Sequence, residues 1–167
     1  EAEIPDTVTS IGERSFADCT KLEKIIFSEK IETINGRAFL GCSSLKSVSL
    51  PDSITSMDTE IFSGCTSLSS VKLPNKCVNI TSSTFEGCTS LTEITLPDTV
   101  TTIQDHAFKN CTALKTINWS KSITDIQSYA FENCDALTKL DIPNTVTNIG
   151  TGAFYECGGF TDIAVPN

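Results

Sequence analysis

A 23-residue period runs through the whole chain of 167 residues and limits what it can fold into. Seven of its eight cysteines are spaced 23 residues apart without insertion or deletion: Cys19, Cys42, Cys65, Cys88, Cys111, Cys134 and Cys157. A column of phenylalanines beginning at Phe16 keeps the same period, as do columns of mostly aliphatic residues beginning at Val8, Ile11, Leu22 and Ile25. A fixed period of this length indicates a tandem structural repeat.

Each repeat predicts two short strands with a helical turn between them. In residues 117–119 the first and third side chains are apolar and the middle one is polar, which is the alternation of a strand. Residues 100–103 follow a Pro-Asp turn and have a strand-like Val-x-x-Ile pattern. Between such strands, residues 107–114 read Ala-Phe-x-x-Cys-x-x-Leu, with the i, i+3, i+6 spacing of a short helical turn.

The repeats should fold only when they are stacked. One unit buries about seven apolar side chains worth about 1.5–3 kcal/mol each, whereas ordering its residues costs about 1.5 kcal/mol per residue. Stacking lines up the columns and lets equivalent strands pair in a parallel β-sheet on one face. We predict one domain of seven units over residues 4–164, with residues 165–167 as the start of a further repeat.

The chain has 12 basic and 21 acidic residues, a net charge of −9, and no local cluster of lysine or arginine. This charge argues against a phosphate backbone as partner, so no nucleic acid is expected. No apolar run approaches the roughly 18 residues of a membrane span, so we expect no membrane insertion by this segment. The N-terminal residues show no signal-peptide pattern.

Nothing in the sequence points to catalysis, a cofactor or a metal site. His106 is the only histidine and should be a solvated surface residue, and motifs such as Gly-x-Ser-x-Gly and His-Glu-x-x-His are absent. Asp52 and Asp98 follow proline in a turn, where aspartate is expected to bond local backbone. Because residues such as Asn75 and Lys121 take the same place in other repeats, no calcium ladder is predicted. A cysteine column one residue wide cannot converge on zinc. We predict buried, reduced thiols that act as small apolar side chains, with Cys77 at an aliphatic position.

The pattern in residues 91–111, Leu-x-x-Ile-x-Leu-Pro-x-x-Val-x-x-Ile-x-x-x-Ala-Phe-x-x-Cys, resembles the leucine-rich repeats of the Treponema pallidum class, also called BspA-like repeats. The resemblance covers residues 4–166, with departures such as Ser28 and Ser120 for proline and Trp119 for leucine. It implies an α/β repeat solenoid, a curved stack with the parallel β-sheet on its concave face and short helical or irregular turns opposite. It also implies an extracellular or cell-surface protein of a host-associated bacterium or protist, with a role in adhesion.

The outward strand positions are the predicted contact surface, because repeat proteins that bind ligands usually do so through the concave sheet. They are Lys24, Ile26, Ser47, Ser49, Ser70, Lys72, Glu93, Thr95, Thr116, Asn118, Lys139 and Asp141. This set is polar and has no aromatic residue of the kind that anchors tight interfaces. Solubility alone also explains such residues, so binding and simple exposure stand as alternatives.

Three Asn-x-Ser/Thr sequons begin at Asn79, Asn110 and Asn118, all at positions predicted to face outward. They are candidate N-glycosylation sites in a secretory eukaryote. Chance in a chain rich in Asn, Ser and Thr explains them equally well. A glycan on Asn118 would cover part of the predicted concave sheet.

The sequence is compatible with two functions of different classes. The first is a non-enzymatic cell-surface or secreted scaffold for adhesion, which binds a protein or glycan on host or neighbouring cells. The second is a structural subunit of an extracellular fibre, in which copies stack head to tail. Reduced cysteines also suit the cytosol, so an intracellular binding scaffold stays open as an alternative to the first. The sequence starts and stops in one phase of the repeat without capping residues, which predicts either a slice of a longer surface protein or such a filament.

Overall fold

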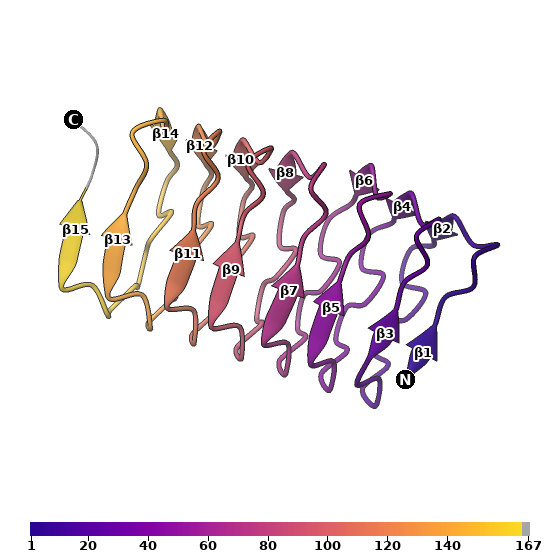
Figure 1. Ribbon diagram of the computed structural model, residues 1–167. Helices are drawn as coiled ribbons and strands as arrows, with labels where there is room; N and C mark the ends of the chain where they lie inside the picture. The colour runs from indigo at the N-terminus through magenta and orange to yellow at the C-terminus, as the bar shows by residue number, and fades with distance from the viewer. Residues whose placement is uncertain (165–167) are drawn as a thin grey trace.

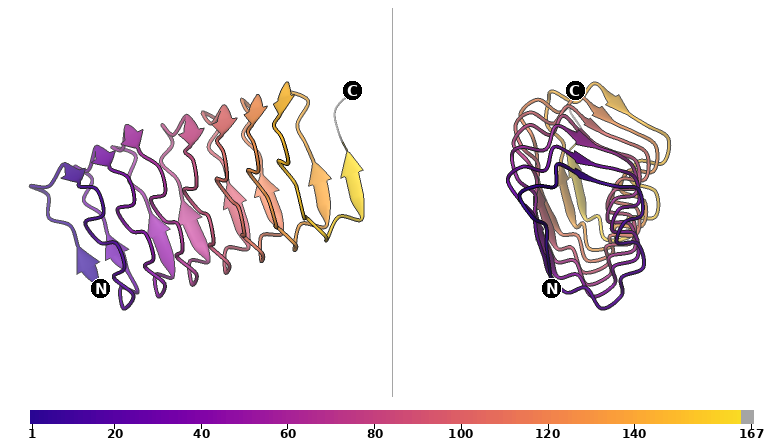
Figure 2. Two further views of the ribbon diagram at one scale, coloured as in Figure 1. Left: turned by 180° about the vertical axis from the view of Figure 1, so that it is seen from behind. Right: turned by 90° about the vertical axis from the view of Figure 1, so that its right-hand side faces the viewer.

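The computed structural model describes residues 1–164, apart from the side chains of 162–164, and the further repeat predicted at 165–167 lies outside this range. The described chain is a solenoid of stacked coils whose paired strands are all parallel (Figure 1). Two rows of short strands run along it, and a stack of tight turns closes the coils on a third side (Figure 2). The predicted repeat solenoid is confirmed.

The strands repeat at the period of the sequence. The first row, which we call the odd-strand face, consists of β1 (Ala2–Glu3), β3 (Ile25–Ile26), β5 (Ser47–Ser49), β7 (Ser70–Lys72), β9 (Glu93–Thr95), β11 (Thr116–Asn118), β13 (Lys139–Asp141) and β15 (Asp162–Ala164). The second row, the even-strand face, consists of β2 (Ser10–Ile11), β4 (Thr33–Ile34), β6 (Ser56–Met57), β8 (Asn79–Ile80), β10 (Thr102–Ile103), β12 (Asp125–Ile126) and β14 (Asn148–Ile149). Equivalent residues of neighbouring repeats lie opposite each other, as Ile94 does with Ile117.

Neither row is one continuous sheet, contrary to the uninterrupted ladder that the sequence predicted. On the odd-strand face the strands pair two by two, β1 with β3, β5 with β7, β9 with β11 and β13 with β15. An isolated bridge joins Lys24 to Ser47 between two of these pairs. On the even-strand face the order is β2-β4-β6 and then β8-β10-β12-β14, so strand pairing is interrupted between β6 and β8.

The turn segment of each coil is not helical, so the α/β description and the predicted helical turns are wrong. No residue of the described part of the chain lies in a helix. Two residues four positions apart in each segment have positive φ, as His106 (59°) and Asn110 (60°) do in one coil. A residue in the left-handed conformation ends an α-helix. The i, i+3, i+6 spacing instead places apolar side chains on the inner side of consecutive tight turns.

Backbone groups of the turn segment bond alternately between coils and within them. The N–H of Phe39 donates to the carbonyl oxygen of Ile61 in the next coil at 2.9 Å. The carbonyl oxygen of Phe39 accepts the N–H of Cys42 in its own coil at 3.2 Å. Equivalent N–H donation to the next coil recurs for each phenylalanine of the column from Phe16 to Phe131. Neighbouring coils are therefore bonded along the turn stack even where their strands do not pair.

The phenylalanine column forms the centre of the core. Its five fully buried members are Phe39, Phe62, Phe85, Phe108 and Phe131. Their rings stack face to face, with centroids 5.1–5.8 Å apart. Aromatic pairs of this kind contribute about 0.5–1.5 kcal/mol each beyond the area they bury. The coil spacing thus lets the same side chain of each repeat pack on its own equivalent.

The cysteine column forms a second ladder, made of hydrogen bonds to the same backbone. From Cys42 to Cys157, each thiol of the column donates to the carbonyl oxygen of the phenylalanine 26 residues earlier, with S···O distances of 3.0–3.3 Å. All eight cysteines are free; Cys19 is exposed and the others are buried. Cysteine is small and apolar and carries a weak S–H donor. It therefore fills the buried position and also donates to the carbonyl oxygen, which a purely aliphatic residue cannot do.

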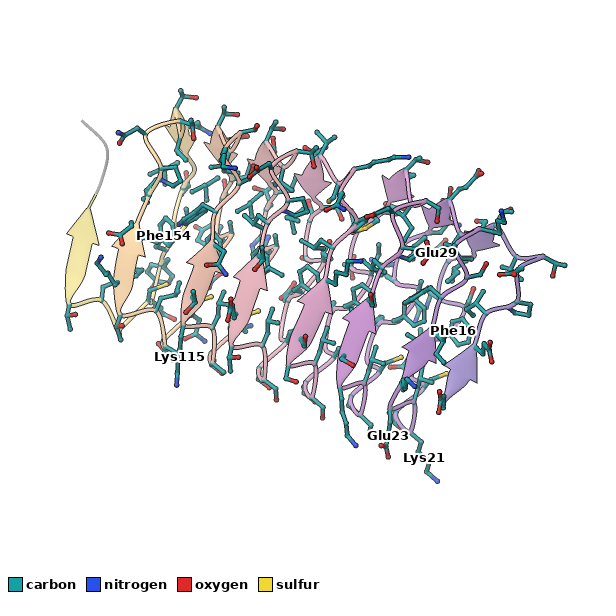
Figure 3. The ribbon with its side chains drawn as sticks, in the orientation of Figure 1. Phe16, Lys21, Glu23, Glu29, Lys115 and Phe154 are labelled. Atoms are coloured by element: carbon teal, nitrogen blue, oxygen red, sulfur yellow. The ribbon has the colours of Figure 1, made fainter. Side chains whose placement is uncertain are left out.

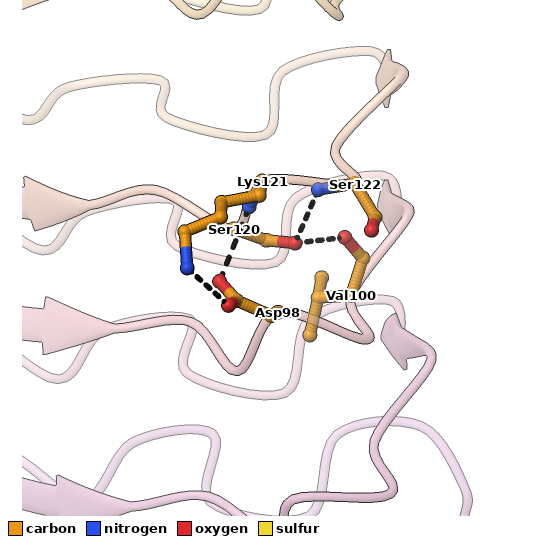
Figure 4. A network of polar contacts seen from close by, with 5 residues as sticks. All are labelled: Asp98, Val100, Ser120, Lys121 and Ser122. Atoms are coloured by element: carbon orange, nitrogen blue, oxygen red, sulfur yellow. Dashed lines mark hydrogen bonds and ion pairs between the residues drawn. The ribbon is translucent and has the colours of Figure 1, made fainter.

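Where serine replaces the proline of the repeat, hydrogen bonds hold the chain instead. The buried hydroxyl of Ser120 donates to the carbonyl oxygen of Val100 at 2.6 Å and accepts the N–H of Ser122 at 3.0 Å (Figure 4). Beside it, Asp98 accepts the backbone N–H and the ammonium group of Lys121 in the next coil, at 3.4 and 2.7 Å. The expectation that this aspartate bonds local backbone is wrong, because its carboxylate links two coils.

Because Gly64 has a positive φ, we predict that adding a Cβ at this residue lowers the stability of the fold. This residue has a φ of 72°, and an added Cβ would meet its nearest atoms, in Gly41, at 3.6 Å, which is ordinary contact. Gly64→Ala should therefore lose about 1–2 kcal/mol through the left-handed conformation alone. Urea unfolding followed by circular dichroism measures the loss. The neighbouring Ser63→Ala is the control, and equal stability of the two variants would contradict the assignment.

The buried thiols predict a loss of stability at alkaline pH. Burial raises the pKa of Cys77 to about 11 and that of Cys88 to about 12, whereas a thiol of the unfolded chain has a pKa of about 8.5. Above about pH 8.5 only the unfolded chain ionises these thiols, so each should remove about 1.4 kcal/mol of stability per pH unit until its folded pKa is reached.

Urea unfolding under reducing conditions at about pH 7.5, 8.5 and 9.5 checks this expectation. Cys77→Val places the aliphatic residue of its column at this position. This variant should lose less stability with rising pH than the original chain, by the contribution of one thiol. Parallel pH profiles for the two chains would show that Cys77 does not titrate in this way.

Candidate binding site

The odd-strand face presents the side chains that the sequence analysis selected. All twelve predicted contact residues, from Lys24 just before β3 to Asp141 on β13, are exposed. They flank inward residues such as Val48, Ile94 and Leu140, which are buried. The predicted direction of these side chains therefore agrees with the structure, while their role in binding stays a prediction.

Polar side chains on and beside this face are linked from one coil to the next. On the face, the amide of Asn118 donates to the carboxylate of Glu93 at 2.6 Å and to the hydroxyl of Thr95 at 3.0 Å. In the preceding loops, Lys46 pairs with Glu23 at 2.6 Å, and its hydrogen bond lowers the pKa of that carboxyl. Exposed pairs of this kind contribute little to stability, because water and salt screen them. They order the surface rather than hold the fold.

The sticks in Figure 3 separate the inner from the outer side chains of this half of the coil. Lys21, Glu23 and Lys115 point into solvent at the loops that precede the odd-numbered strands. Phe16 and Phe154 lie inside the stack. The loops therefore extend the polar surface beyond the ends of the strands.

One aromatic side chain reaches the odd-strand face, where the sequence analysis expected none. Between β11 and β13, which do not pair, a hollow of about 230 Å³ is lined by residues that include Ile117, Trp119 and Leu140. Trp119 is half-buried, and its ring meets Phe131 edge to face at 6.0 Å. The substitution of tryptophan for leucine in this column was the available signal, but the unpaired strands that open the hollow could not be foreseen.

The turn stack carries a second aromatic group. His106, expected to be a solvated surface residue, is half-buried, and its ring stacks on that of Tyr129 with centroids 5.5 Å apart and planes 6° from parallel. The two residues are one period apart in the sequence. Extending the column of His106 by 23 residues would therefore have found its partner.

The three sequons differ in accessibility. Asn79 on β8 and Asn118 on β11 are exposed. Asn110 is half-buried with a φ of 60°, and its side-chain oxygen accepts a hydrogen bond from Asn133 at 2.9 Å. The expected outward position therefore holds for two of the three, and glycosylation itself stays a prediction.

Metal-binding and membrane-spanning features are absent from the described part of the chain. Within residues 1–164, no three His, Cys, Asp or Glu side chains are grouped so that they could hold a metal ion. The same residues contain no helix of the length and hydrophobicity needed to cross a bilayer.

Comparison with known proteins agrees with the fold. A BspA-type leucine rich repeat region, in six copies, matches residues 1–114 and 78–167. A leucine-rich repeat protein of Eubacterium ventriosum has 26% sequence identity and a TM-score of 0.86, over 99% of this chain and 43% of its own. The leucine rich repeat protein of Treponema pallidum has 30% identity and a TM-score of 0.54, over 81% of this chain and 53% of its own.

A leucine rich cell surface protein of Faecalibacterium prausnitzii is also similar, with 25% identity and a TM-score of 0.51, over 97% of this chain and 58% of its own. The chain thus spans between two fifths and three fifths of the length of these relatives. No curated protein matches it. The repeats that match cover the whole sequence, and the chain belongs to the BspA-type leucine rich repeat family.

Proposed function

We propose that this chain is a non-enzymatic scaffold of a cell-surface or secreted protein, and that it binds a protein or glycan of host or neighbouring cells through the odd-strand face. The observation that carries the proposal is the surface itself. Twelve outward side chains, all exposed, lie on or directly beside six neighbouring strands, and the hollow that Trp119 lines opens among them.

The composition of the face suits contact with a partner. Its strands present short hydroxyl side chains at Ser47, Ser49 and Ser70, which leave the sheet accessible to another molecule. Tryptophan is among the residues that contribute most to binding when an interface covers them. Extended surfaces of stacked repeats are the usual binding surfaces of solenoid proteins.

The relatives support the location. The similar protein of Faecalibacterium prausnitzii is described as a cell surface protein, and it is 25% identical over nearly all of this chain. Since the present chain covers 58% of that relative, other parts of such a protein could attach it to the cell. A scaffold exposed outside the cell would meet proteins and glycans of other cells first.

Substitution of Trp119 tests the proposal. Trp119→Leu restores the residue that Leu50, Leu73 and Leu96 provide in the same column, so the core should stay intact. Collagen, laminin, fibronectin and mucin, each immobilised, serve as probes in biolayer interferometry. We expect the original chain to bind at least one of them and Trp119→Leu to bind it at least about tenfold more weakly. Trp119 is the only tryptophan, so its fluorescence should shift on binding.

Ser56→Arg on the even-strand face is the matched surface control and should bind as the original chain does. Ser70→Arg, on an exposed position of β7, should weaken binding by blocking the odd-strand face. If Ser56→Arg lost binding while Ser70→Arg kept it, the binding site would lie on the even-strand face instead. Absence of binding together with concentration-dependent rods in light scattering would favour the fibre-forming alternative.

A further inference from the structure

Two adjacent columns of the turn stack place an aromatic and charged cluster on the surface of the last coils. One column runs His106, Tyr129 and Gly152, and the second, three residues further along each coil, runs Lys109, Glu132 and Tyr155. Tyr155 is exposed by 53%. Together with Thr151, these six residues line a shallow hollow of about 610 Å³, on a different side of the coil from the odd-strand face.

Gly152 lets the Tyr129 ring approach the backbone of the following coil. Its φ is 60°, and a Cβ on it would lie 2.5 Å from Cε1 of the Tyr129 ring. The ring therefore leans over the glycine, in the space that a side chain would occupy. As a result, the column of side chains ends at Tyr129, and one side of the aromatic pair borders the hollow.

Two polar side chains of the hollow form an ion pair, a donor beside an acceptor, whose charges cancel. Lys109 Nζ lies 2.9 Å from Glu132 Oε2, and these side chains are only 28% and 17% exposed. The hydrogen bond with Glu132 raises the pKa of Lys109, so the ammonium group stays charged near neutral pH. Glu86 precedes Lys109 in its column, and Glu156 follows Tyr155 in the chain. The surroundings are therefore acidic and unsuited to an anionic ligand.

We propose that this hollow is a binding site for a neutral carbohydrate, with one pyranose ring against Tyr129 and Tyr155 and its hydroxyls on Lys109 and Glu132. The site is separate from the odd-strand face and does not depend on the function proposed for that face.

The chemistry of the lining favours a sugar over a peptide side chain. Aromatic rings have a negative face, which attracts the polarised C–H groups on one side of a pyranose. A sugar hydroxyl both donates and accepts, so neighbouring hydroxyls match an ammonium beside a carboxylate. None of the residues around this hollow in the described chain is Leu, Ile, Val or Met, so an aliphatic side chain would find no apolar pocket. Convergent polar groups beside aromatic side chains are typical of small-molecule sites.

The only histidine of the chain reports on this site by NMR. The probes are the methyl glycosides of glucose, galactose, mannose and N-acetylglucosamine, and lactose beside 3′-sialyllactose. We expect at least one neutral sugar to shift the His106 ring C–H resonance, with a dissociation constant on the order of 1 mM, because a single ring contacts the site on one side only. The fluorescence of Trp119, on the other face, should not change.

Two variants test the assignment. Serine occurs at the equivalent position Ser83 with a φ of 53°, so Tyr129→Ser should fold, and alanine occurs at Ala17, which supports Tyr155→Ala. Each should weaken the sugar at least about tenfold. Arg14→Ser, in the column of Tyr129 but several coils away, is the matched control and should bind normally.

The proposal is overturned if no neutral sugar shifts the His106 resonance. It is equally overturned if both tyrosine variants bind as the original chain does, or if 3′-sialyllactose binds and lactose does not. A shift of Trp119 fluorescence without a change at His106 would place the sugar on the odd-strand face and also reject this site.

Discussion

Hydrogen bonds between the turn segments of neighbouring coils set the spacing on which the rest of the molecule depends. They run without interruption through the phenylalanine positions, from Phe16 N–H to the carbonyl of Ala38 and on to Phe131 N–H and the carbonyl of Ala153. Both rows of strands are interrupted, so the strands alone do not hold the stack. The positive φ values, two in each turn segment, allow this continuous bonding, because they let successive N–H groups point alternately along the coil and toward the next one.

The same spacing explains the composition of the core. A separation of about 5 Å between strands or coils suits stacked aromatic rings, and it brings each thiol of the cysteine column to a phenylalanine carbonyl oxygen of the coil before. A purely aliphatic residue there would leave that oxygen without the thiol donor. The repeated phenylalanine and cysteine are therefore consequences of backbone geometry, and they leave the outward positions free to vary.

Variation at those outward positions is where binding properties can arise on a uniform scaffold. Trp119 on the odd-strand face departs from a column that is mostly aliphatic, and His106 and Tyr129 are the two aromatic residues of one variable column on the turn stack. Each borders a hollow. The first hollow lies between two unpaired strands and the second borders a glycine, so both occur at a local irregularity within a regular array.

The repeat period by itself determined the solenoid, the parallel strands, the apolar columns and the exposure of residues such as Ser47 and Lys72. These features depend only on which residues recur at 23-residue intervals and on the alternation of side chains along a strand. Tertiary structure alone decided that the turn segment is not helical, that the strands pair in short groups, and that Asp98 bonds the next coil. In the turn segment, successive backbone N–H groups donate alternately within their own coil and to the next coil, and the Asp98 carboxylate accepts from the next coil. The spacing of the stacked coils selects between these partners, and a linear sequence does not contain that distance.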